Sequence, residues 1–250
     1  MTSALSLSTK IRSREHILEG RILNTAILSV LFSILQCGQP YYERPNVRVV
    51  TVEPSKVRPF DAVKAQWTAN FTLPDPLFKE SDSNLSPFLS PPDLGLIRVS
   101  ATLYGEEMID AWVRKTCREE SLSYTQAYEQ YENKHHPEDQ FRIELKLQSH
   151  FSEHSLEPEL WTIYLEDDQD VMYEPLSVQK GEIVVKEKEI CAPHSNFPIR
   201  IRQISRTIDL YFPRVTFFGK RLLSQQTKYL RLVFSYQKKP MGDAKWVFGD

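Results

Sequence analysis

The sequence predicts a mainly β fold, an antiparallel β-sandwich with a two-helix insertion around 105–134. Three observations indicate this fold class. Apolar and polar residues alternate in many short runs, as in strands with one buried face. Helical periodicity replaces this alternation in the middle of the chain. The 250 residues are 41% hydrophobic and 26% charged, which is the composition of a folded globular chain and not of a disordered one.

Alternation of apolar and polar residues marks the strands in order along the chain. Period two is clearest over 63–73, and it returns over 97–103 and 141–147. Shorter strands are expected over 47–52, 161–165, 171–173, 183–185, 199–204, 208–212, 230–236 and 246–248. The acidic run 166–170 fits the polar turn of a hairpin. So many short strands favour two packed antiparallel sheets.

Two helices are expected to form a hairpin at 105–134. Apolar residues from Met108 to Val113 recur at helical spacing, after two glutamates that complement the positive end of the helix dipole. Ser123 and Gln126 have the spacing of a capping box, which typically begins a helix. Pro137 is expected to end the hairpin, because proline cannot continue a helix.

The strand pattern resembles that of immunoglobulin-like modules, which are antiparallel β-sandwiches. The resemblance consists of the number and spacing of short strands alone. It implies two sheets packed face to face over 60–250, with the helical hairpin as an insertion. Cys117 falls within the expected first helix, so the cysteine–tryptophan–cysteine spacing of antibody domains is missing.

The N-terminal residues predict an export signal. The run 22–36 is uncharged and follows a basic region, and at 1.5 Å per residue it reaches only about 22 Å. It therefore fits the apolar region of a signal peptide better than a membrane span. An uncleaved membrane anchor and a core helix are the alternatives. We expect a signal peptide at 1–36, an extended tether at 37–59 and a β-sandwich domain at 60–250.

The end of this run, Ile34-Leu35-Gln36-Cys37, resembles the lipobox of bacterial lipoproteins. Gln36 departs from the family pattern, in which a small residue precedes the cysteine. The resemblance implies that Cys37 becomes the first mature residue and carries acyl chains. Each buried CH₂ of such a chain contributes about 0.8 kcal/mol to membrane binding. The resemblance thus implies an exported protein that its N-terminal lipid anchors in the cell envelope, on the periplasmic or outer-surface side.

Two further cysteines, Cys117 and Cys191, are a possible disulfide in an exported protein. Closing the loop between them would stabilise the fold by roughly 4 kcal/mol in the chain-entropy model. The alternative is that both are free thiols. No CxxC motif occurs, so the spacing excludes a zinc ribbon or a thioredoxin-like pair.

The composition and motifs exclude several classes of function. The 31 basic and 33 acidic residues leave a net charge of −2 without a basic stripe, which argues against nucleic-acid binding. No GxG, P-loop or G-x-S-x-G motif occurs, so no cofactor and no catalytic residue are predicted. His150, Glu153 and His154 spell the inverted zinc-protease motif H-x-x-E-H, but they follow a strand and read as a loop. A metal-dependent hydrolase built on them is the alternative to a protein that is not an enzyme, and no metal ligand is predicted.

The remaining candidates are contact residues. Phe217, Phe218, Lys220 and Arg221 join two expected strands, and aromatic residues and arginine dominate protein interfaces, so they are a possible partner contact. The sequence therefore favours a membrane-anchored binding or accessory protein of the cell envelope, with an envelope protein as its possible partner. A carbohydrate-binding module is the other alternative, and it would expose Trp67, Trp161 or Tyr173 on a flat sheet face.

Overall fold

The structure, a computed structural model, describes residues 46–49, 58–79, 95–191, 198–216, 219–224 and 226–248. All of them belong to one compact unit, Arg44–Asp250. The predicted signal peptide 1–36 and the predicted lipidation site Cys37 lie outside the described residues, as does most of the predicted tether. Within the described ranges, no helix has the length and apolar character needed to cross a bilayer.

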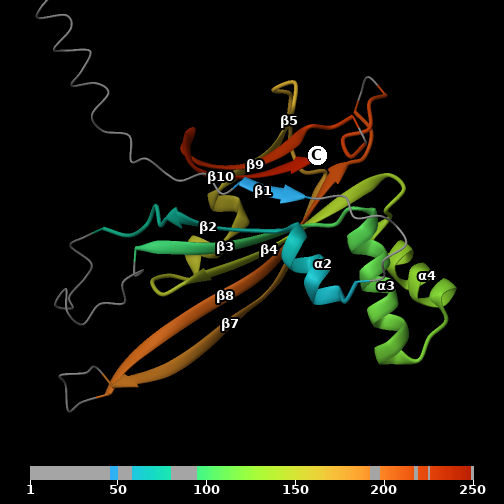
Figure 1. Ribbon diagram of the computed structural model, residues 1–250. Coiled ribbons are helices and arrows are strands. Elements are labelled where there is room, and N and C mark those ends of the chain that lie inside the picture. Colours follow the sequence, from blue (N-terminus) through green and yellow to red (C-terminus); the bar gives the residue numbers. More distant parts are fainter. Residues whose placement is uncertain are drawn as a thin grey trace, which may run out of the picture. The chain divides into compact units, whose positions relative to one another are not determined.

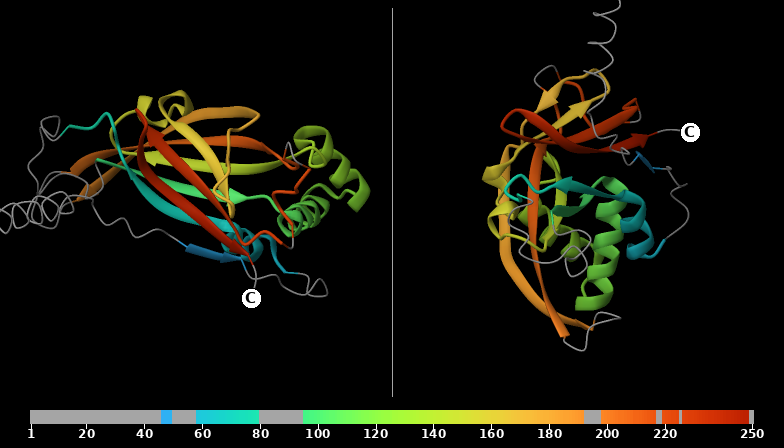
Figure 2. Two further views of the ribbon diagram at one scale, coloured as in Figure 1. Left: turned by 90° about the horizontal axis from the view of Figure 1, so that it is seen from above. Right: turned by 90° about the vertical axis from the view of Figure 1, so that its left-hand side faces the viewer.

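In the described ranges, ten strands form two five-stranded sheets (Figures 1 and 2). Sheet A has the order β1 (Asn46–Val49), β10 (Lys239–Phe248), β9 (Tyr229–Tyr236), β5 (Thr162–Asp167) and β6 (Met172–Tyr173). Sheet B has the order β2 (Thr68–Pro74), β3 (Leu96–Leu103), β4 (Gln140–Ser149), β8 (Pro198–Pro213) and β7 (Ser177–Cys191). All neighbours are antiparallel except β1 and β10, which pair in parallel. The prediction of a mainly β, two-sheet fold is thus confirmed, whereas the sandwich type is not.

The expected helical hairpin is present as α3 (Glu106–Glu120) and α4 (Tyr124–His135), inserted between β3 and β4. Both halves of the capping box form: the Gln126 amide donates to Ser123 Oγ at 3.3 Å, and the Ser123 amide donates to Gln126 Oε1 at 3.1 Å. Gly105 precedes α3, where a Cβ would lie 2.7 Å from the Trp67 ring. Glycine therefore allows the chain to pass closely over this ring.

The strand predicted over 63–73 is wrong in its first half. Residues Phe60–Trp67 form the helix α2, and the strand β2 begins only at Thr68. Val63 and Trp67 are buried while Ala65 is exposed, so the buried positions are four residues apart. Residues with apolar side chains at every second position also include a set at i and i+4, which is one face of a helix. The alternation was therefore compatible with both structures.

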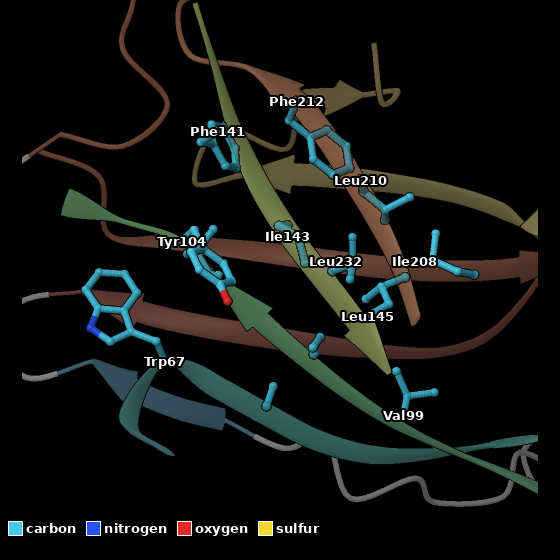
Figure 3. Close-up of a cluster of buried hydrophobic side chains, with 14 of the residues drawn as sticks. Trp67, Val99, Tyr104, Phe141, Ile143, Leu145, Ile208, Leu210, Phe212 and Leu232 are labelled. Carbon is cyan, nitrogen blue, oxygen red and sulfur yellow. The ribbon is translucent and has the colours of Figure 1, made fainter. Parts of the chain in front are cut away.

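The hydrophobic core lies between the two sheets and takes side chains from both. Figure 3 shows Leu232 of β9 beside residues of β4 and β8 that point to the same interior, among them Leu145 and Ile208. Phe71 of β2 and Phe234 of β9 bring the sheets together at a ring distance of 5.8 Å. Leu145, Ile208 and Leu232 are completely buried.

The hairpin of β7 and β8 is longer than the sequence predicts. The expected short strands 183–185, 199–204 and 208–212 are parts of two strands of 15 and 16 residues. Figure 1 shows the joined ends of β7 and β8 reaching beyond the neighbouring strand β4. The residues of β7 and β8 between these short runs are mostly polar, so the sequence pattern does not reveal the length of the hairpin.

Short elements complete the described part of the fold. Two 3₁₀ helices, η2 (His154–Leu156) and η3 (Pro158–Leu160), connect β4 to β5. The predicted hairpin around the acidic run 166–170 is confirmed, because β5 and β6 pair in antiparallel register on either side of it. This hairpin leads directly into β7, so the chain passes here from the edge of sheet A to the edge of sheet B.

Candidate interaction surface

Exposed apolar side chains are concentrated in one segment of the chain, 171–185, where β6 leads into β7. Eight large hydrophobic residues are exposed in the described part of the chain, and six of them fall within 171–185. We call these six the edge surface: Val171, Met172, Leu176, Val178, Val184 and Val185. Met172 and Leu176 are 64% and 63% exposed, which is more than any other large apolar residue in the described ranges. Clustered exposed apolar residues mark interaction sites more often than isolated ones do.

Both strands of the edge surface are end strands of their sheets. β6 ends sheet A, and β7 ends sheet B. The backbone amide of Leu176 donates to the Tyr211 carbonyl at 2.7 Å, which fixes the connection between the two strands against β8. Adjacent residues of a strand point to opposite faces, so Val184 and Val185 place apolar side chains on both faces of the β7–β8 hairpin. The edge surface thus combines apolar side chains with the outer edge of a sheet.

Asp167 holds the turn before β6 in one conformation. Its Oδ1 accepts hydrogen bonds from the amides of Gln169 at 2.9 Å and Val171 at 3.0 Å. Its Oδ2 accepts from the Tyr173 hydroxyl at 3.1 Å. Burial opposes the charge of this carboxylate, but the two amides and the hydroxyl outweigh it and lower the pKa of Asp167. A fixed turn positions Met172 on the edge of sheet A.

A bulge in β7 sets the position of its exposed valines. The pairing with β8 shifts between Lys180 and Ile183. Gly181 lies in this shift, where a Cβ would come within 2.9 Å of the Thr207 carbonyl oxygen. The Gly181 carbonyl in turn accepts a hydrogen bond from Arg206 Nε at 3.0 Å. Bulges bend and twist a strand, and this one begins the part of β7 that carries Val184 and Val185.

The cations near the edge surface already have anionic partners. Lys180 Nζ lies 2.7 Å from Glu159 Oε1, and Arg206 Nη1 lies 2.6 Å from Glu157 Oε2. These ion pairs connect the hairpin to η3 and its flanking residue. These pairs neutralise the charges of Lys180 and Arg206 at the start of the hairpin.

The predicted partner contact is only partly within the described residues. Phe217 and Phe218 lie outside them, so their role stays a prediction. Lys220 Nζ donates to Asp168 Oδ1 at 3.0 Å and to Asp167 Oδ2 at 3.4 Å. Arg221 is exposed and pairs through its backbone with Val215. Lys220 therefore stabilises the acidic turn. This contact joins residues 52 positions apart, so sequence spacing does not reveal it.

The residues of the zinc-protease motif do not share an α-helix. His150 follows β4 and its Nδ1 lies 2.9 Å from the Arg202 carbonyl oxygen, while His154 begins the three-residue η2. Glu153 forms an ion pair with Arg202 of β8. The described residues hold no group of three or more histidine, cysteine, aspartate or glutamate side chains arranged to bind a metal ion. Nothing in this geometry supports the hydrolase alternative.

The aromatic residues named for carbohydrate binding do not form an exposed platform. Trp67 and Trp161 are buried, and the Trp161 indole donates to the Ser155 carbonyl at 3.0 Å. Tyr173 is half-buried, with its hydroxyl on Asp167. The expectation that one of these residues lies exposed on a flat sheet face is therefore wrong. Their apolar surface is used in packing instead.

A buried polar cluster lies under the helices, on the face of sheet B that points away from sheet A. It consists of Tyr104, Tyr131, His135, Arg142, Glu144, Asp209 and Tyr211. The Arg142 guanidinium lies 3.7 Å from the centre of the Tyr104 ring, and it is 3.6 Å and 3.8 Å from carboxylate oxygens of Asp209 and Glu144. An arginine so buried requires such partners, because an uncompensated charge in the interior is costly.

The hydrogen bonds in this cluster have a defined direction. Arg142 Nη1 lies 3.2 Å from His135 Nε2, and because a guanidinium has only donors, Nε2 is the acceptor. His135 then carries its proton on Nδ1, which lies 2.8 Å from the Tyr211 hydroxyl oxygen. That hydroxyl donates to Gln179 Oε1 at 3.3 Å. This chain of bonds fastens the end of α4 to β4, β8 and the start of β7.

The pKa values in the cluster follow from burial and the arginine. Burial, together with the positive charge of Arg142, lowers the pKa of His135 to about 3. Burial raises the pKa of Tyr211 to about 12 and raises the pKa of Asp209 as well. Burial opposes the charge of Glu144, but Lys64, whose Nζ lies 2.7 Å away, together with Arg142 and the Tyr104 hydroxyl outweighs burial and lowers the pKa of that carboxyl. The cluster therefore joins helix to sheet.

A cavity of about 190 Å³ opens beside the helical hairpin. It is lined by Glu106, Ile109, Asp110, Tyr124, Tyr128, Pro137 and Arg214. Glu106 pairs with Arg214 at 2.8 Å, and Asp110 pairs with Arg114 at 2.8 Å and accepts from the Tyr124 hydroxyl at 2.9 Å. The charged side chains of this lining are therefore already paired.

Cys117 is half-buried on α3 and forms no disulfide with another residue whose side chain the structure describes. Cys191 ends β7, and its side chain lies outside what the structure describes. The disulfide between the two is not confirmed and stays a prediction.

Sequence reasoning missed both the edge surface and the buried cluster. The adjacent pair Val184–Val185 was a usable signal, because two neighbouring apolar residues on a strand cannot share one buried face. Arg142 and Glu144 were another signal, because they alternate with core residues on β4, the strand that follows the helical hairpin.

The fold and the edge surface define a β-rich, two-sheet protein with an apolar sheet edge. No family model matches the chain, and no curated protein or solved structure matches it significantly.

Proposed function

We propose that the protein is a non-enzymatic binding module that is held at a membrane and takes a protein partner on the edge surface. The observation that carries this proposal is the clustering of exposed apolar residues on the end strands of both sheets. Exposed strand edges pair readily with other chains, and apolar side chains beside them add affinity. An envelope protein is the proposed class of partner.

The membrane tether in this proposal comes from the N-terminal sequence. The resemblance of 34–37 to a lipobox supports export of the chain and acylation of Cys37. Acyl chains would hold the folded unit at the envelope surface without a membrane-spanning segment. An immunoglobulin-like sandwich over 60–250 is part of the same proposal, and two antiparallel-rich sheets with a shared core support it.

Site-specific photo-crosslinking in intact cells tests the binding surface. A photoreactive amino acid at Met172 is expected to give one defined crosslinked product, whose second protein is identified by mass spectrometry. The same residue placed at Glu129, an exposed polar position on α4, serves as the matched control. Leu176→Glu should abolish the product at position 172, because it puts a charge into the apolar contact. Equal crosslinking at 172 and 129, or a product that persists with Leu176→Glu, would contradict the proposal.

A further inference from the structure

Few side chains hold α4 to the rest of the protein. Of its 12 residues, only Ala127, Tyr131 and His135 are buried, and they recur at intervals of four. Ala127 and Tyr131 belong to the hydrophobic core, whereas His135 makes polar contacts. Gln140 Nε2 adds one hydrogen bond to the His135 carbonyl at 3.1 Å. The docking of the last turn of α4 therefore depends mainly on His135.

The His135 ring contacts two strands with a fixed arrangement of protons. Its Nε2 accepts from Arg142 of β4 at 3.2 Å, and its Nδ1 donates to the Tyr211 hydroxyl of β8 at 2.8 Å. A proton on Nε2 would turn this acceptor into a donor that faces a guanidinium, which has only donors. The protonated ring therefore cannot keep its docked position beside Arg142.

We propose that acidification from pH 7 to pH 5 releases the last turn of α4, residues 132–136, from sheet B while both sheets stay folded. In the released state the imidazolium of His135 lies in water, and Arg142 keeps Asp209 as its ion-pair partner. The inference concerns a different part of the molecule from the edge surface, and it goes beyond the proposed function.

The residues on either side of 132–136 have anchors of their own. Before the segment, the Tyr131 ring packs against the Trp112 ring at a centroid distance of 5.2 Å. After it, Arg214 Nη1 donates to the Pro137 carbonyl, and the Arg214 amide donates to the Asp139 carbonyl at 2.9 Å. These anchors do not involve the His135 ring, so the release is confined to the turn between them.

The release breaks no strand pairing. The strand β4 begins only at Gln140, and it pairs with β3 and β8 through residues outside the released turn. His136, which ends α4, has a φ of 44°. A residue other than glycine adopts this left-handed conformation at an energetic cost, and release removes that cost. Segments with few buried apolar contacts open locally at a lower free energy than the whole fold.

The groups that face the His135 ring in the described part of the chain carry no negative charge between pH 7 and pH 5. They belong to α4, β4 and β8, and they are Tyr131, Lys134, His136, Arg142 and Tyr211. Burial raises the pKa of both tyrosines, so they stay neutral. Burial, followed by the positive charges of Arg142, Lys134 and His136, lowers the pKa of His135 to about 3. In water the ring regains its ordinary pKa of 6.5, so in this pH range the released turn binds a proton and the docked turn does not.

Hydrogen exchange of the full-length protein at pH 7 and pH 5 tests the release. After correction for the intrinsic effect of pH, exchange of the amides at 134–136 reports the population of the released state. In the docked state the His136 amide donates to the Glu132 carbonyl at 2.9 Å. With pKa values of 6.5 and about 3, the released population should rise about 25-fold between the two pH values. Because the release exposes little surface, it should not respond to low urea, whereas exchange in β9 should.

Two variants isolate the histidine. His135→Gln keeps a neutral side chain that can accept from Arg142, and it should abolish the rise at pH 5. His136→Asn removes the exposed imidazole next to it and should keep the rise, because asparagine tolerates a positive φ. Both variants retain Asp209 and Glu144, so a pH effect of these carboxylates would appear equally in all three proteins.

Three results would overturn the inference. The first is the absence of a rise in the unmodified protein, and the second is an equal rise in His135→Gln. The third is exchange at 134–136 that depends on urea as steeply as exchange in β9, because the end of α4 would then open only with the whole fold. If His135→Gln does not fold, the urea dependence of the unmodified protein and of His136→Asn still decides.

Discussion

Acidification should destabilise the fold through one buried histidine. His135 is only 3% exposed, accepts a hydrogen bond from Arg142 on Nε2 and donates from Nδ1 to Tyr211. Protonation of Nε2 would break the bond to Arg142 and place two positive charges side by side without water. For this reason burial and Arg142 lower the pKa of His135 from its ordinary value of 6.5 to about 3.

The size and sign of the effect follow from this difference in pKa. Between about pH 6.5 and pH 3 the unfolded chain binds a proton at this site and the folded chain does not, so the free energy of unfolding falls as the pH falls. Each pH unit within this window costs up to about 1.4 kcal/mol. From pH 7 to pH 5, the contribution of His135 to stability should fall by about 2 kcal/mol.

Urea unfolding at pH 7 and pH 5, followed by tryptophan fluorescence, measures this loss. His135→Gln has no titrating imidazole, so it should lose about 2 kcal/mol less than the unmodified protein over the same interval. His154→Gln removes an exposed histidine on η2 and serves as the control for a generic loss of imidazole. If the unmodified protein and His135→Gln lose the same free energy between the two pH values, His135 is not the sensitive group and the reasoning is refuted.

Three further substitutions test other parts of the structure. Arg142→Met should lower the free energy of unfolding by about 3–5 kcal/mol because it leaves Asp209 without its ion-pair partner and His135 Nε2 without its donor, whereas Arg114→Met at an exposed ion pair should cost roughly 0.5 kcal/mol or less in the same urea titration. Burial and Asp167 together raise the pKa of Tyr173 to about 12, so Asp167→Asn should lower this pKa only part of the way to 10.0 in an NMR titration of labelled tyrosine, and an unchanged pKa would mean that the carboxylate does not act on the phenol. Ser123→Ala should cost about 1 kcal/mol through loss of the α4 cap, and a neutral result in thermal unfolding would contradict the capping box.

Much of the fold could be predicted because the core imposes its pattern on the strands that line it. Ile97, Val99 and Leu103 alternate with polar residues since one face of β3 meets sheet A and the other does not. The capping box at Ser123 is equally local, because its partners are three residues apart. At Val63 and Trp67 in α2 the pattern fits both a strand and a helix, and tertiary contacts then determine which of the two forms.

The candidate sites could not be predicted in the same way because they depend on contacts between distant residues. His135 meets Tyr211, 76 positions away, and Lys220 reaches back 52 positions to Asp168. No local spacing encodes such pairs. The edge surface depends on which strands end the two sheets, and this follows from the strand order rather than from the sequence of β6 or β7.

The central claim is that this folded unit is fastened to a membrane by its N-terminal end and acts as a surface-held module. Mass spectrometry of the intact protein, extracted from the membrane fraction of its own cells, tests this claim most directly. We expect a chain that begins at Cys37 and carries the added mass of acyl groups. A soluble chain that still contains residues 1–36, with an unmodified Cys37, would contradict it.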